Sequence, residues 1–220
     1  MKTKEIVIWF AVIVALVGGF WFLINAVNAP PSPSAPVEIK NLPPVSANDF
    51  IRGNPSAKVT LIEYADFQCP ACATMHATIK KLQADFRNDL KLVYRFFPLI
   101  NIHQNSLIST QAVYAAGLQG KFWEMSDLVY ENQDSWSDNA QAKNIFVDYA
   151  KELGLDLNKF NSDINSDSTN KFVTDAENSA LNLGINSTPT LFLNRKIIQD
   201  PTSYSYEDFK KLIQDEIKAQ

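Results

Sequence analysis

The chain has 220 residues, of which 20 are basic and 24 acidic, so its formal net charge is −4. Hydrophobic residues make up 46% of the sequence, which is enough apolar material for a packed core and excludes a wholly disordered chain. The acidic balance and the scattered Lys and Arg argue against nucleic acid as a partner, because phosphate binding needs grouped basic side chains. With only 2 cysteines, a scaffold held by several disulfides is also excluded.

The first apolar segment, residues 6–24, reads IVIWFAVIVALVGGFWFLI and carries no charge. As a helix rising ~1.5 Å per residue it would be ~28 Å long, close to the hydrocarbon thickness of a bilayer. Lys2 and Lys4 precede it and the next basic residue is Lys40. Because positive residues stay on the cytoplasmic side, residues 1–5 are predicted to form a cytoplasmic N-terminus. We therefore expect a single-pass signal anchor, in contact with the lipid bilayer of the cell membrane, and an extracytoplasmic remainder.

A cleaved secretory signal peptide is the alternative for this segment. The small residues of Val27-Asn28-Ala29 have the spacing of a cleavage site. Pro30 would follow the cut and disfavours it, and the apolar run exceeds the ~7–15 residues of a usual signal core. The sequence therefore favours a retained transmembrane helix.

A proline-rich linker is expected next, over residues 25–47. Residues 30–36 read PPSPSAP, and proline fixes φ and removes the N–H donor, so this stretch is predicted to be extended. The folded domain is then predicted over residues 48–220. Its first buried strand is residues 59–64, where β-branched and apolar residues follow one another.

Pro70 suits the first turn of a helix, and the KLVYRFF stretch at residues 91–97 predicts a second strand. An all-helical region is predicted over about residues 103–184, since apolar residues recur there at i, i+3 or i+4. The stretches with this spacing are residues 111–118, 122–130, 142–153 and 171–183.

The last third of the domain returns to strands. Residues 190–193 and 196–198 predict a hairpin joined at Asn194-Arg195. Ser205 is placed to cap a final amphipathic helix, with Asp208 at its third position. The order of elements predicts an α/β fold with one large helical insertion between the second and third strands.

The two cysteines form a Cys69-Pro70-Ala71-Cys72 motif between a strand and a helix. N–H groups and the helix dipole stabilise an anion at a helix start, so Cys69 is predicted to have a lowered pKa and to act as a nucleophile. Cys72 lies three residues later on the same helix face, close enough for a redox-active disulfide with Cys69. Such a pair carries two electrons through a mixed disulfide with another protein and needs no cofactor.

Two other uses of the thiols are a zinc site and a purely structural bridge. Zinc would add His76 and His103 to the two cysteines, but the spacing is irregular and the only thiols would be consumed. A structural bridge would close too small a loop to stabilise much. We therefore expect no metal, and interpret His76 as a helix-surface residue and His103 as a polar loop residue.

Glu63 lies six residues before Cys69 within an apolar strand. Burial would raise its pKa and suit it to exchange protons with Cys72. The alternative is a strand-end glutamate that reaches water. Pro189, at the entry to the third strand, is a candidate for a cis peptide bond.

Together these pieces resemble the DsbA-like branch of the thioredoxin superfamily. The matching sequences are VTLIEYADFQCPAC, YRFFPL, AAGLQGKFWEMSDLVYENQ and GINSTPTLFLN, spread over roughly residues 50–220. The resemblance implies a thioredoxin fold with a helical domain inserted between the second and third core strands. It also implies that Cys69 is the nucleophile, Cys72 the resolving cysteine and Glu63 the buried acid.

The resemblance further implies that Pro189 is the cis-proline facing the disulfide and that the backbone of Thr188 pairs with an extended substrate. Pro70 and Ala71 are then expected to contact the substrate as well. The strongly oxidising members have His where this chain has Ala71, which cannot hydrogen-bond to the Cys69 thiolate. This departure predicts a less oxidising reduction potential.

The function implied is a protein-disulfide oxidoreductase that oxidises thiols of exported proteins and is reoxidised by a quinone-linked membrane enzyme. One alternative is a reductase or isomerase whose Cys69 and Cys72 are kept reduced by a membrane donor. The other is a non-catalytic thioredoxin-fold module that binds a partner. The sequence leaves the direction of electron flow open.

Overall fold

The protein is described here from a computed structural model, which covers residues 9, 12–14, 16–21, 37–39 and 41–219. The chain divides into two compact units, Met1–Pro33 and Ser34–Gln220. In the first unit the described residues are helical, and no helix of the described residues is long and apolar enough to cross a bilayer. The predicted anchor over residues 6–24 lies partly outside the described residues, and the spacer at 25–36 lies wholly outside them.

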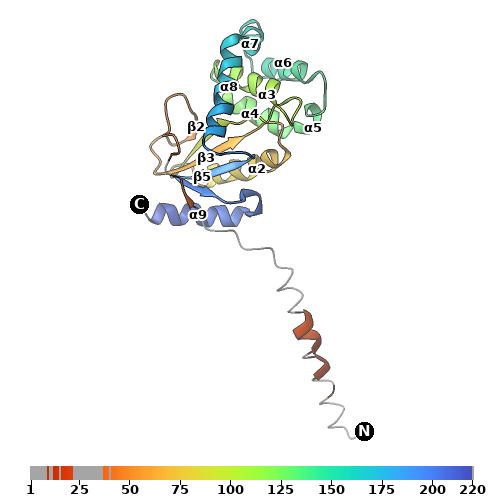
Figure 1. Cartoon of the computed structure of the whole chain (residues 1–220), viewed down its shortest axis with the longest axis vertical. Coiled ribbons are helices and arrows are strands. Elements are labelled where there is room, and N and C mark those ends of the chain that lie inside the picture. Colours follow the sequence, from red (N-terminus) through yellow and green to blue (C-terminus); the bar gives the residue numbers. More distant parts are fainter. Residues whose placement is uncertain (1–8, 10–11, 15, 22–36, 40, 220) are drawn as a thin grey trace. The chain divides into compact units, whose positions relative to one another are not determined.

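One mixed sheet forms the centre of the second unit (Figure 1). Its strand order is β1-β6-β5-β3-β4-β2, with β3 and β4 parallel and the other neighbouring pairs antiparallel. The carboxyl ends of the parallel strands β3 and β4 lie side by side, and the loop that leads from β3 to Cys69, called the motif loop below, begins there. The strands are β1 (Val37–Glu38), β2 (Phe50–Gly53), β3 (Val59–Ala65), β4 (Leu90–Phe96), β5 (Thr190–Leu193) and β6 (Lys196–Ile198).

Helices lie between and after these strands. The final one begins at a capping box in which Ser205 accepts from the N–H of Asp208, as predicted. The helices are α2 (Pro70–Asp85), α3 (Ser106–Gly117), α4 (Phe122–Glu131), α5 (Gln133–Trp136), α6 (Ala142–Glu152), α7 (Leu157–Ile164), α8 (Asp167–Asn182) and α9 (Tyr206–Lys218), and the short 3-10 helix η1 spans Pro201–Ser203.

Helices α2 and α9 cover one face of the sheet. Ile79 of α2 and Phe209 of α9 pack in one cluster with Leu61 of β3. Side chains alternate between the two faces along a strand, so Glu63, two residues after Leu61, points to the same face. The fold therefore places Glu63 beneath the helix that carries the cysteines.

Helices α3 to α8 form the predicted insertion between β4 and β5. Trp136, Phe146 and Phe160 are fully buried within it and form part of its core. The structure adds α7, which the sequence pattern did not predict. Its start is set by Asp156, whose side chain accepts from the N–H groups of the next turn.

The predicted linker end at residue 47 differs from the structure. Strand β1 pairs with β6, and Leu42 is 3% exposed in the cluster on the other face of the sheet. Arg95 of β4 donates to the carbonyls of Pro43 (3.2 Å) and Pro44 (3.0 Å). These contacts hold a proline-rich stretch on the domain, so the folded unit begins before the predicted residue 48.

Candidate active site

The motif lies at the junction of β3 and α2. Cys69 is the N-cap of α2 with an extended backbone, and Pro70 occupies the first turn, where a missing N–H breaks no helix bond. Cys69 is 6% exposed and Cys72 is fully buried; both are free thiols. The predicted nucleophile is thus at the surface end of the pair and its partner lies beneath it.

The surroundings of Cys69 favour its thiolate. A hydrogen bond from Cys72 lowers the pKa of Cys69 to about 6, against the opposing effect of burial. The Thr188 side chain and the N–H groups of Cys72 and Ala71 add to this lowering, and the Thr188 hydroxyl, buried without an aligned partner among the described residues, is left to donate to the thiolate. Cys69 is therefore ionised at neutral pH, the state in which a thiol attacks a disulfide or leaves one.

Cys72 has the opposite character. Burial raises the pKa of its thiol well above the ordinary value, and the negative charges of Cys69 and Glu63 raise it further. Of the two thiols, Cys69 therefore loses its proton first and Cys72 keeps its own. This asymmetry divides the pair into a nucleophile and a proton-holding partner.

Glu63 is 2% exposed and lies in register between Tyr94 of β4 and Leu191 of β5. Burial raises its pKa to about 8, and the negative charge of Cys69 contributes. Its Oε1 has no hydrogen-bond partner among the described residues. The alternative of a strand-end glutamate reaching water is wrong, and the carboxyl is protonated at neutral pH.

The loop before β5 faces Cys69 from the other side. The Thr188–Pro189 peptide bond is cis, as the sequence suggested, and Cys69 Sγ lies 3.4 Å from the Thr188 carbonyl oxygen, to which it donates when protonated. Pro189 is buried, Pro70 is exposed and Ala71 is half-buried. The residues expected to contact substrate therefore flank the nucleophile on both sides.

Replacing Thr188 with Val is expected to raise the pKa of Cys69 by about one unit, because Val cannot donate a hydrogen bond to the thiolate. Ultraviolet thiolate absorbance during a pH titration measures this. The matched control is Thr190→Val, whose hydroxyl donates to the Ser187 carbonyl at 2.8 Å instead. An unchanged Cys69 titration in Thr188→Val would rule out the role of that hydroxyl.

Two tyrosines beneath the motif were not predicted. The hydroxyl groups of Tyr94 and Tyr130 lie 3.0 Å apart, and Tyr94 donates to the Ala65 carbonyl at 3.3 Å. Burial raises the pKa of both phenols well above the ordinary value, and the charge of Glu63 adds to it. The pair therefore stays neutral. Both tyrosines belong to the buried cluster that contains Cys72, and Tyr94 lies opposite Glu63 in the sheet.

Gln133 of α5 ties the insertion to the motif loop. Its amide donates to the carbonyls of Phe67 (2.7 Å) and Cys69 (3.1 Å), and its side chain is buried. A long-range contact of this kind leaves no periodic signal in the sequence. The helical insertion thus positions the backbone that presents the nucleophile.

Replacing Gln133 with Ala is expected to cost about 2 kcal/mol of unfolding free energy, because two buried carbonyls lose their donor. Urea unfolding measures this. Gln119→Ala is the control, because its bonds to Asp156 are exposed and water replaces them. Equal costs in the two variants would contradict the account.

His76 departs from its predicted place at the helix surface. It is 8% exposed, its ring stacks on Tyr130 at 4.8 Å, and its Nε2 lies 3.1 Å from Asp127 Oδ1 without hydrogen-bond alignment. Asp127 also receives two hydrogen bonds from Arg52, both of 3.1 Å. Helix α4 covers this face of α2, which the helical spacing alone did not reveal.

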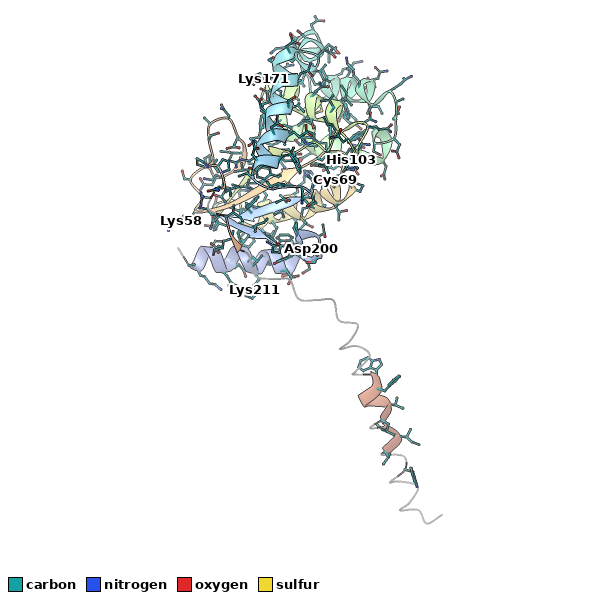
Figure 2. The ribbon with its side chains drawn as sticks, viewed as in Figure 1. Lys58, Cys69, His103, Lys171, Asp200 and Lys211 are labelled. Atoms are coloured by element: carbon teal, nitrogen blue, oxygen red, sulfur yellow. The ribbon has the colours of Figure 1, made fainter. Side chains whose placement is uncertain are left out.

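His103, labelled in Figure 2, also departs from a plain loop residue, since its Nδ1 lies 2.6 Å from Oδ2 of the buried Asp66. The zinc arrangement of the two cysteines with His76 and His103 is therefore not formed. Across the described part of the chain, no group of three or more His, Cys, Asp or Glu side chains is placed to hold a metal.

A family model described as Thioredoxin matches residues 46–215. The chain is a member of the thioredoxin family. Its fold is similar to that of alpha-DsbA1 from Wolbachia pipientis, with a TM-score of 0.69 and 22% identity over 81% of this chain and 94% of that one. The fold is also similar to that of oxidised BdbD from Bacillus subtilis, with a TM-score of 0.70 and 21% identity over 84% of this chain and 100% of that one.

This thioredoxin-family chain also matches parts of longer proteins. One is named Na(+)/H(+) antiporter NhaA 1, from Mycolicibacterium gilvum, with 38% identity over 175 residues, which is 77% of this chain and 27% of that protein. Another, from Herminiimonas arsenicoxydans, is 37% identical over 69% of this chain and 23% of its own length. The chain thus spans about a quarter of the length of the curated relatives it matches. The antiporter activity in their names belongs to those longer proteins.

Proposed function

We propose that this protein is a membrane-anchored, extracytoplasmic thiol:disulfide oxidoreductase that oxidises thiols of exported proteins. The observation that carries the proposal is the opposition between the two thiols: Cys69, 6% exposed, has a lowered pKa, and the fully buried Cys72 has a raised pKa. A structural disulfide or a binding module has no need of this asymmetry. A redox couple does, because one sulfur must attack or leave while the other waits protonated.

The proposed cycle begins with the Cys69–Cys72 disulfide. A substrate thiolate attacks Cys69 Sγ, the Cys69–Cys72 bond breaks, and Cys72 takes a proton from Glu63. A second substrate thiolate then attacks the substrate sulfur of the mixed disulfide, and Cys69 leaves as the thiolate. The substrate loses two electrons and the cysteine pair gains them.

The cycle needs an electron acceptor, for which we propose a separate quinone-linked oxidase in the membrane. The uncharged run at residues 6–24, with Lys2 and Lys4 before it, supports placement of the domain outside the membrane, next to such a partner. The substrate would lie extended along Thr188 and over Pro70 and Ala71, since these residues flank the exposed side of Cys69.

The reductase or isomerase reading has one observation in its favour. Ala71 offers no donor side chain to the Cys69 thiolate, so the reduced form is less stabilised than with a histidine there. Rapid alkylation of thiols in living cells, followed by mass spectrometry of Cys69 and Cys72, distinguishes the oxidase from the reductase or isomerase. A mostly oxidised pair is expected, and a mostly reduced pair would contradict the oxidase.

A further inference from the structure

The loops after β3 and β4 leave the sheet side by side. The two strands are parallel, with Ala65 opposite Phe96, and the N–H of Phe97 donates to the Ala65 carbonyl at 2.9 Å. The first loop leads to Cys69 and the second to His103. Figure 2 shows both labelled residues at this edge of the domain.

Asp66 joins the two loops. Its backbone carbonyl accepts the N–H of Cys69 at 3.1 Å, and its fully buried carboxylate accepts from the N–H groups of Gln68 (2.9 Å) and Leu99 (3.0 Å). The same carboxylate lies 2.6 Å from Nδ1 of His103. One buried residue therefore fixes both the motif loop and the imidazole.

The contact determines which ring nitrogen donates. A carboxylate only accepts hydrogen bonds, so Nδ1 of His103 is the donor, and Nε2 is the nitrogen left to accept a proton. The side chain keeps 19% of its surface exposed. A buried aspartate that holds a partly exposed histidine and also accepts from the N–H of a reactive cysteine is an arrangement suited to moving a proton.

We propose that His103, oriented by Asp66, accepts the proton of the incoming substrate thiol. The inference rests on the proposed oxidation of thiols. A thiol attacks only after it loses its proton, and Ala71 gives the motif no base of its own. The chain has 2 His, and the other, His76, lies against Asp127 beneath α4.

The step balances as follows. The substrate S–H gives its proton to Nε2 of His103 while its sulfur bonds to Cys69 Sγ. The Cys69–Cys72 bond breaks, and Cys72 receives its proton from Glu63. His103 then releases its proton to solvent, and Glu63 takes one up from solvent. The second substrate thiol loses its proton to His103 and attacks the substrate sulfur of the mixed disulfide, and Cys69 leaves as the thiolate, so the pair gains two electrons and each substrate thiol loses one proton.

The test is His103→Asn in the full chain, because the Asn amide can still donate to Asp66 but has no basic nitrogen. Two reductants are compared, a peptide with alkyl thiols and an aromatic thiol that is already ionised. We expect at least about a tenfold loss of rate with the peptide and an unchanged rate with the aromatic thiol. His103→Ala, checked for folding by urea, should give the same contrast.

Equal slowing with both reductants would mean a structural role for His103 and would overturn the inference. An unchanged rate with the peptide would overturn it too. Failure of the proposed oxidation itself is distinguishable, because the unmodified protein would then oxidise neither reductant. The unfolding midpoints of the variants separate loss of folding from loss of the base.

Discussion

Cys72→Ser is expected to accumulate stable mixed disulfides between Cys69 and substrate proteins. In this variant the Cys69 thiolate attacks a substrate disulfide, one substrate sulfur leaves as a thiolate, and the other stays bonded to Cys69. The Ser hydroxyl cannot attack that mixed disulfide as the Cys72 sulfur would. Cys69, at the surface end of the pair and with a pKa of about 6, remains able to react. Non-reducing electrophoresis followed by mass spectrometry measures the trapped species.

Cys69→Ser is the matched control, with the same substitution three residues earlier. The remaining Cys72 is fully buried and its pKa is raised, so it should trap almost nothing. Abundant complexes through Cys72 in this variant would reverse the assigned roles. Absence of complexes in both variants would favour the non-catalytic binding module.

Glu63→Gln is expected to slow thiol–disulfide exchange by about 100-fold. The buried carboxyl supplies the proton that Cys72 takes as it leaves, and general acid catalysis of this kind contributes ~10²–10⁴-fold. Gln has nearly the same shape and hydrogen-bonds, but it cannot give up a proton. Stopped-flow mixing of the oxidised protein with a dithiol peptide measures the rate, and a loss below threefold would refute this role.

The same variant should also be more stable at alkaline pH. Glu63 has a pKa of about 8 when folded and 4.5 as the ordinary value, so the folded reduced protein holds a proton that the unfolded chain releases. Stability is therefore lost as pH rises from about 4.5 through 8, by up to about 5 kcal/mol. Glu63→Gln removes this loss.

The reduced Glu63→Gln protein should thus melt up to about 10 °C above the unmodified protein at pH 9 and close to it near pH 4.5. Calorimetry across this range tests the burial of the carboxyl independently of any activity. A difference that does not depend on pH would show that the two side chains differ in packing and that Glu63 is not neutral when folded.

Features set by local rules were predictable from the sequence. Cys69 and Pro70 follow helix-start chemistry, and Ser205 with Asp208 forms the predicted capping box. The helical insertion was predicted because the apolar residues recur at helical spacing between the second and third predicted strands. The position of Glu63 within an apolar strand was enough to predict its burial, which the structure confirms.

Features set by long-range packing were not predictable from the sequence. Tyr94 and Tyr130 meet only because α4 crosses the motif helix, and the same crossing buries His76. The linker boundary was misplaced because proline-rich composition predicts an extended spacer, while Arg95 supplies donors to its carbonyls from a distant strand. No role for Asp66 was predicted from the sequence, although a carboxylate three residues before a reactive cysteine was a readable signal.

The most direct measurement mixes the purified oxidised protein with one equivalent of an unfolded dithiol peptide and follows both by mass. The account predicts that the Cys69–Cys72 disulfide disappears as the peptide disulfide forms, one for one, through a transient complex bonded to Cys69. A pair that stays oxidised while the peptide stays reduced would contradict the central claim that these two thiols are a working redox couple.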